Sequence, residues 1–103
     1  MLRKLLIYRK TEMRLAWERD GRRCIKCGRY TEAPSHHGIK GADRRRGVDW
    51  QHHDFVLTLC LECHDEVERW SRGKFIEFLK AHNYLGIFDR LIQQLEAWYP
   101  SYV

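Results

Sequence analysis

The sequence predicts a small α+β protein, one domain over residues 1–103, that is held together by a bound zinc ion. Three observations predict it: two CxxC cysteine pairs, one short run of β-forming residues, and helical spacing of apolar residues on both sides of that run. A chain of 103 residues is too short for two workable cores. Hydrophobic residues make up 44% of it, so it should fold, but so small a core usually needs a staple.

The N-terminal third is predicted to be helical and then irregular. A first helix is expected over residues 4–19, with Thr11 as an alternative N-cap of a shorter one. Asp20-Gly21 ends it, and residues 33–39 are expected to be extended after Pro34. The apolar residues of this helix fit loosely on one face: Leu5, Leu6, Met13, Ala16 and Trp17.

The middle of the chain is predicted to be a loop, a strand and a helix. Residues 41–53 are polar and contain three consecutive arginines, which is typical of a surface loop. The stretch Phe55-Val56-Leu57-Thr58-Leu59 is rich in β-formers and is expected to be a strand. Helical spacing follows from Leu61 to about Trp70, with early acidic residues that suit the helix dipole.

Two more helices are expected in the C-terminal extension, residues 71–99. Ser71 is placed to cap the first of them. The last one carries apolar residues from Ile87 to Trp98. Aromatic residues at helical spacing are far more often core than a base-stacking surface, so we expect core. The apolar positions are Phe75, Ile76, Phe78, Leu79, Ile87, Phe88, Leu91, Ile92, Leu95 and Trp98.

Charge is divided unevenly along the chain. Residues 1–46 carry 14 basic and 5 acidic side chains, a net of +9, whereas residues 47–103 carry 5 and 9, a net of −4. A basic half suits a polyanionic partner, because neutralised phosphates release counterions and so drive binding. The N-terminal apolar run is only three residues long, which predicts neither a secretory signal nor a membrane span. We therefore expect a reducing cytosol.

The cysteines predict a structural zinc site. Cys24 and Cys27 form one CxxC pair, and Cys60 and Cys63 form a second after 32 intervening residues. Paired thiolates at this spacing suit a closed tetrahedral site, which leaves no position for water. This zinc should therefore hold the fold and do no chemistry.

Five of the six histidines lie between or beside the cysteine pairs: His36, His37, His52, His53 and His64. Hydrolysis of a phosphodiester near neutral pH needs a base for water, a cation for the developing charge, and positive groups for the backbone. Histidine suits the first role, and histidine with carboxylate can hold a divalent metal. His64 follows Cys63 directly, so the zinc would fix its direction.

Residues 19–69 resemble the cysteine-rich, zinc-containing kind of HNH endonuclease, on the strength of RDGRRCIKCGR, HHGIKG and FVLTLCLECHDE. The resemblance implies a ββα fold with a catalytic metal between strand and helix. It implies His37 as the general base, and His36 and His64 as ligands of the catalytic metal. Where the family usually carries Asn, this chain has Gln51 to Phe55, and Asp54 is our choice for that role, with His53 as the alternative.

These observations together predict a metal-dependent DNA endonuclease of low sequence specificity, with structural zinc and a catalytic Mg²⁺ or Mn²⁺. Arg44, Arg45 and Arg46 are expected to contact the DNA backbone, because no basic recognition helix stands out. The alternatives are a non-catalytic zinc module that binds nucleic acid, a structure-selective or RNA-cutting nuclease, or a structural interaction domain. The resemblance further implies the cytoplasm of a bacterium or phage-infected cell, with phage or mobile-element proteins as partners and no membrane.

Overall fold

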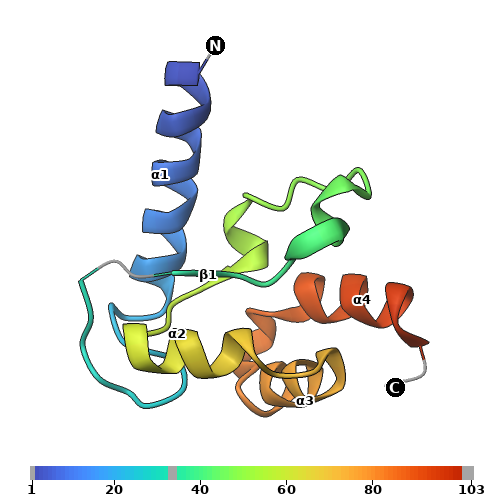
Figure 1. The fold of residues 1–103 in the computed structure, drawn as a ribbon. Helices are drawn as coiled ribbons and strands as arrows, with labels where there is room; N and C mark the ends of the chain where they lie inside the picture. The colour runs from blue at the N-terminus through green and yellow to red at the C-terminus, as the bar shows by residue number, and fades with distance from the viewer. Residues whose placement is uncertain (1, 33–34, 101–103) are drawn as a thin grey trace.

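The fold is α+β, as predicted. A computed structural model describes residues 2–32 and 35–100. It contains a two-stranded antiparallel sheet and four α-helices (Figure 1). In chain order the elements are α1 (Leu2–Arg19), β1 (His36–His37), η1 (Gly41–Arg45), η2 (His53–Phe55), β2 (Val56–Leu57), α2 (Leu61–Glu68), α3 (Arg72–Ala81), η3 (Tyr84–Gly86) and α4 (Asp89–Trp98), where η marks a 3-10 helix.

The sheet brings the two adjacent histidines against the core. His36 pairs with Leu57 and His37 with Val56, and the amide of Gly38 donates to the Phe55 carbonyl at 2.7 Å. Only two residues of the predicted 55–59 strand pair in this way, because Phe55 closes the preceding 3-10 helix. Both histidines of β1 are buried.

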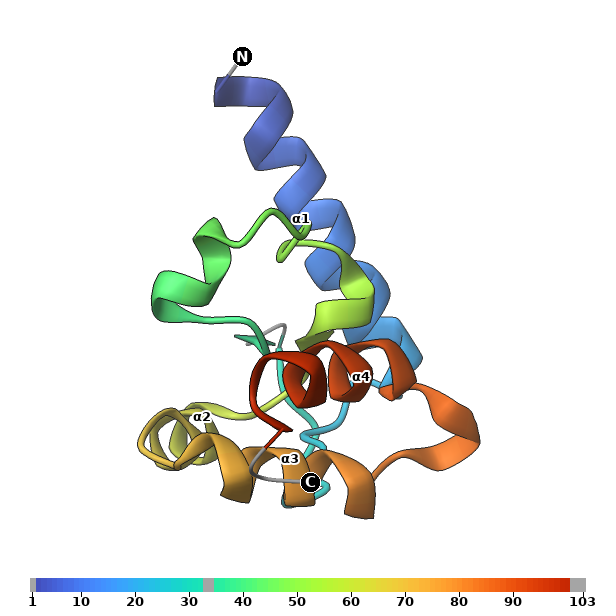
Figure 2. The ribbon, with the colours of Figure 1, turned by 90° about the vertical axis from the view of Figure 1, so that its right-hand side faces the viewer.

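α1 is one continuous helix whose N-terminal end projects beyond the other elements (Figures 1 and 2). The Thr11 hydroxyl donates to the Ile7 carbonyl at 2.9 Å, so Thr11 lies inside the helix and the alternative start there is wrong. The end of α1 is anchored to β2, since the Arg19 guanidinium donates to the carbonyl of Val56 at 2.7 Å. No helix in the described part of the chain is long and apolar enough to cross a bilayer.

The core lies between the sheet and the C-terminal helices. The apolar positions that were expected to be core in α3 and α4 are buried or packed against the buried cluster, which confirms core over a stacking surface. Ser71 caps α3 as predicted, with its hydroxyl accepting from the Lys74 amide at 3.2 Å. The last helix begins at Asp89, two residues later than Ile87, because η3 precedes it.

The segment 41–53 is more ordered than the predicted loop. Its first residues form η1, and the Asp43 side chain is buried there. The Asp43 carboxylate accepts hydrogen bonds from the Tyr99 hydroxyl at 2.7 Å, from Arg46 at 2.9 Å and from Arg72 at 3.2 Å. This aspartate therefore ties η1 to both C-terminal helices, a role that polarity alone does not reveal.

Candidate metal centres

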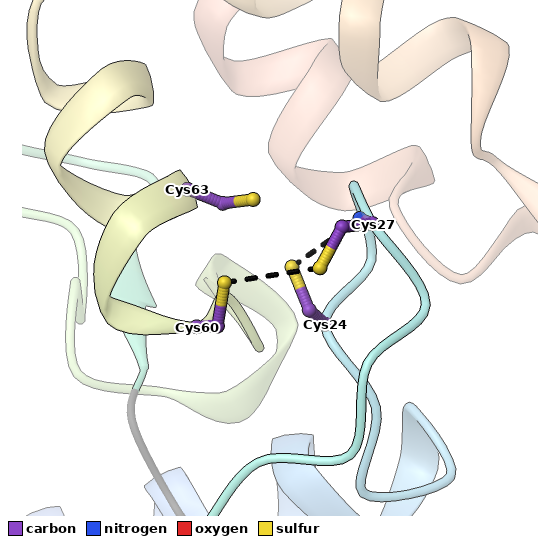
Figure 3. A group of neighbouring side chains, drawn as sticks. All are labelled: Cys24, Cys27, Cys60 and Cys63. Carbon is purple, nitrogen blue, oxygen red and sulfur yellow. Dashed lines mark hydrogen bonds between the residues drawn. The ribbon is translucent and has the colours of Figure 1, made fainter.

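The four cysteines converge from two separate segments. Cys24 and Cys27 lie in the turn after α1, whereas Cys60 caps α2 and Cys63 lies within it (Figure 3). Their sulfurs all lie within 4.8 Å of one another, and the Cys27 and Cys60 sulfurs are 3.8 Å apart. A Zn–S bond of about 2.3 Å places neighbouring sulfurs of a tetrahedron roughly 3.8 Å apart. The predicted cluster is confirmed, and it could hold a structural zinc ion.

The electrostatics of the cluster also suit a cation. Burial opposes ionisation of Cys24, but backbone hydrogen bonds from Cys27, Cys60 and Lys26 outweigh it and lower its pKa to about 7. Burial, followed by hydrogen bonding to the neighbouring thiols, raises the pKa of Cys63. The Cys24 thiolate thus forms readily, whereas the Cys63 thiolate needs a nearby positive charge, which zinc would supply.

A second group of potential ligands joins β1 to α2. The donor atoms of His36, His64 and Glu68 lie within 4.8 Å of one another. The His36 and His64 rings are 4.9 Å apart between centroids, and the Glu68 carboxylate lies 3.5 Å from His36 Nδ1. Two imidazoles with one carboxylate form a donor set that divalent metals accept.

His36 carries the clearest indication of a ligand. Its side chain is 2% exposed, and within the described residues neither ring nitrogen has a hydrogen-bond partner. Burial first, then the charges of His64 and Lys40, lower its pKa to about 3, so the ring is neutral. A buried neutral imidazole without partners costs free energy unless something else occupies its nitrogens. The residues present therefore fit a divalent ion at this position.

A cavity of about 370 Å³ opens beside this group. His37 lies in it, and His37 Nε2 is buried without a hydrogen-bond partner among the described residues. Burial, followed by the charges of Arg9 and Arg44, lowers the pKa of His37 to about 4. The cavity is lined by Arg9, Met13, Ser35, His36, His37, Lys40, Arg44, Leu61, His64 and Glu68.

The cavity wall carries three cationic side chains from separate elements. Arg9 comes from α1, Lys40 precedes η1, and Arg44 lies within it. The Arg44 guanidinium is 4.2 Å from the centre of the Trp50 ring, and His37 packs edge-on against the same ring. Burial lowers the pKa of Lys40, although the charge of Glu68 opposes that shift. An anion in the cavity would meet all three cations.

The three consecutive arginines have different surroundings. Arg44 lines the cavity, Arg46 pairs with buried Asp43, and Arg45 is exposed. The Arg46 guanidinium also lies 5.1 Å from the centre of the Trp98 ring. The side chain of Arg46 thus already has partners within the fold.

Asp54 and His53 lie outside this cavity. Asp54 forms an ion pair with Arg90 at 3.1 Å, and His53 Nδ1 lies 3.1 Å from the buried Glu12 carboxylate. Neither lines the cavity or joins the group of His36, His64 and Glu68 among the described residues. The role of the middle motif position stays a prediction.

Three charged residues of the cavity were missed by the sequence analysis: Glu68, Arg9 and Lys40. Glu68 follows His64 by four residues on α2, and this spacing on one helix face is a sequence feature that could have identified it. Arg9 reaches the cavity only because α1 packs beside the sheet, so no local pattern indicates it.

Comparison of this chain with protein-family models, with curated proteins and with solved structures finds no match. The resemblance to HNH endonucleases therefore rests on the motif residues, and the assignment is a proposal.

Proposed function

We propose that this chain is an HNH-type endonuclease that hydrolyses phosphodiester bonds in DNA with the help of a divalent metal. The observation that carries the proposal is that one cavity contains both a group of potential metal ligands and a separate neutral histidine. His36 is buried with both ring nitrogens unpartnered beside His64 and Glu68, and His37 lies next to it as a neutral imidazole. A module that only binds phosphate needs neither feature.

Metal binding and proton transfer are assigned to different residues of the cavity. His36, His64 and Glu68 would hold the metal, which supplies positive charge for the developing charge on the phosphate. His37 is the base: its neutral Nε2 accepts a proton from water. A pKa of about 4 keeps this nitrogen unprotonated at neutral pH but makes it a weak base, so it needs an electropositive site that acidifies the water.

The surrounding cations favour a phosphate substrate. Arg9, Lys40 and Arg44 line the cavity and would hold the DNA backbone on either side of the scissile bond. Such contacts read no bases, which agrees with low sequence specificity. The cysteine cluster contributes indirectly, because Cys63 precedes His64 in α2 and a metal bound there would fix the direction of the helix.

The test is cleavage of supercoiled, linear, single-stranded and branched DNA in a series of Mg²⁺ and Mn²⁺ concentrations. His37→Ala should lose most cleavage and keep DNA binding. His82→Ala is the matched control, since His82 caps α3 away from the cavity. Binding without cleavage in any metal would favour the non-catalytic module, and cleavage of RNA alone would favour the RNA-cutting alternative.

A further inference from the structure

A second hollow lies on α1 beside the histidine cavity. It measures about 470 Å³ and is lined by Lys10, Met13, Arg14 and Trp17. These positions follow the i, i+3, i+4, i+7 spacing of one helix face. Met13 also lines the histidine cavity, so the two hollows are adjacent.

The floor of this hollow is mainly apolar, and its rim is cationic. Met13 and Trp17 supply the apolar surface. The indole is held in place because Trp17 Nε1 donates to the Thr31 carbonyl at 2.8 Å. A fixed aromatic residue with a methionine beside it can contact a flat apolar ring with little loss of side-chain freedom.

The cations of the rim have no carboxylate of their own. Lys10 and Arg14 are exposed, and neither has an ion-pair partner in the part of the chain that the structure describes. By contrast, Arg22 pairs with Glu18 at 2.9 Å and Lys26 with Glu66 at 2.7 Å. The unpaired charges at the hollow are therefore available to an anionic partner.

We infer that this hollow binds an unpaired nucleobase of the nucleic acid whose backbone occupies the histidine cavity. Lys10 and Arg14 contact the phosphates on either side of that base. A base within a duplex has both faces stacked, so only an unpaired base can enter an apolar hollow. The inference rests on the proposed function and narrows it: the chain prefers DNA with a single-stranded segment next to the cleaved bond.

The charge pattern and the position of the hollow favour this occupant over a peptide. The hollow lies in the basic half of the sequence, which carries a net charge of +9. It opens beside a cavity whose wall holds Arg9, Lys40 and Arg44. A strand that crosses from one hollow to the other keeps its phosphates near cations along this path.

The experiment measures binding separately from cleavage, with no added divalent ion. Fluorescence anisotropy gives the Kd of a 12-nucleotide oligo-dT and of a 12-base-pair duplex. Met13→Ala should weaken single-strand binding about fivefold or more and duplex binding by a smaller factor, since Met13 also lines the histidine cavity. Leu15→Ala, an exposed apolar residue of α1 outside both hollows, should change neither.

The salt dependence of binding tests the contribution of Lys10 and Arg14. Lys10→Ala combined with Arg14→Ala should lower the slope of log K against log salt for the single strand by about 0.7 per lost phosphate contact. Lys4→Ala, on the same helix outside the hollow, is the matched control. Oligo-dT should also quench tryptophan fluorescence, and Trp17→Phe should reduce that quenching.

The outcomes separate this inference from the proposed function. If Met13→Ala matches Leu15→Ala on both substrates and Trp17→Phe leaves the quenching unchanged, the inference is overturned, even when the parent cleaves DNA. If Met13→Ala weakens single-strand binding but the parent cleaves no substrate in any metal, the nuclease proposal fails and the hollow stands as a binding site.

Discussion

The cysteine cluster and the histidine cavity share α2, since Cys63 belongs to the first and His64 to the second, yet the two regions are built differently. The cluster has four identical donors, whose sulfurs all lie within 4.8 Å of one another. The cavity is lined by the mixed donors His36, His64 and Glu68, by a further histidine, His37, and by cationic side chains. The first arrangement suits a metal that stabilises the fold, and the second suits a metal that meets a substrate.

The two regions also depend differently on the rest of the chain. The cluster needs one turn, which carries Cys24 and Cys27, and the start of one helix. The cavity takes residues from α1, β1, η1 and α2, so it exists only after these elements have packed together. Loss of the cluster should therefore remove the cavity, whereas changes in the cavity should leave the cluster intact.

Loss of zinc should have the largest effect. Chelation, or Cys60→Ser, should unfold the domain, because metal binding and folding are coupled in sites of this size. The measurement is a thermal melt followed by circular dichroism, with His64→Ala as the control that keeps its melting transition. A chelated protein that melts like the parent would remove the structural role from the cluster.

Loss of the His37 imidazole should slow DNA cleavage without loss of the fold. His37→Ala is expected to cut DNA about 10²- to 10⁴-fold more slowly, because a positioned base contributes that much. Its DNA affinity should stay within a few-fold of the parent. Single-turnover cleavage and a binding titration on the same preparation measure the two effects. A parental rate, with contaminating nuclease excluded, would show that His37 is not the base.

Loss of the Glu68 carboxylate should change only the concentration of metal that cleavage requires. Glu68→Gln keeps the size of the side chain but removes its charge, so about tenfold more Mn²⁺ should be needed for half-maximal cleavage. The maximal rate should stay near that of the parent. Glu66→Gln on the same helix is the control, since Glu66 faces Lys26 and not the cavity. Identical metal titrations for all three proteins would exclude Glu68 as a ligand.

The smallest effects should come from the arginine run. Arg46→Ala should cost about 1 kcal/mol of stability, since its partly exposed ion pair with Asp43 is screened by solvent. Arg44→Ala should instead lower the salt slope of duplex binding by about 0.9. Denaturant melts and salt titrations of the two variants separate the roles. The reverse pattern would place Arg46, and not Arg44, on the DNA.

Acid should weaken the Asp43 contact in a defined range of pH. Burial raises the pKa of Asp43, but hydrogen bonds from Tyr99, Arg72 and Arg46 outweigh it and hold the pKa below 3.8. A lowered pKa means that this contribution to stability is present above the unfolded-state value and is lost as pH falls through the folded-state value. Asp43→Asn should therefore destabilise at pH 7, and its difference from the parent should shrink as pH falls below 3.8, as melts across this range would show.

Sequence reasoning succeeded where the relevant spacing is local. The CxxC pairs and the 71–81 helix with its Ser71 cap follow from neighbours within a few residues. Sequence reasoning was less successful where tertiary packing determines the burial or position of a residue. Polarity in 41–53 gave no sign that Asp43 would be buried, and the position of Asp54 depends on η2, which turns it toward Arg90.

We expect the chain to hold two different metals at two separate sites, one at the cysteine cluster and one at His36, His64 and Glu68. Elemental analysis after dialysis, followed by calorimetric titration with Mn²⁺, tests it most directly on the parent and on His64→Ala. We expect one retained zinc in both proteins and one further, exchangeable Mn²⁺ in the parent only. A His64→Ala protein that binds Mn²⁺ like the parent, or that loses its zinc, would contradict it.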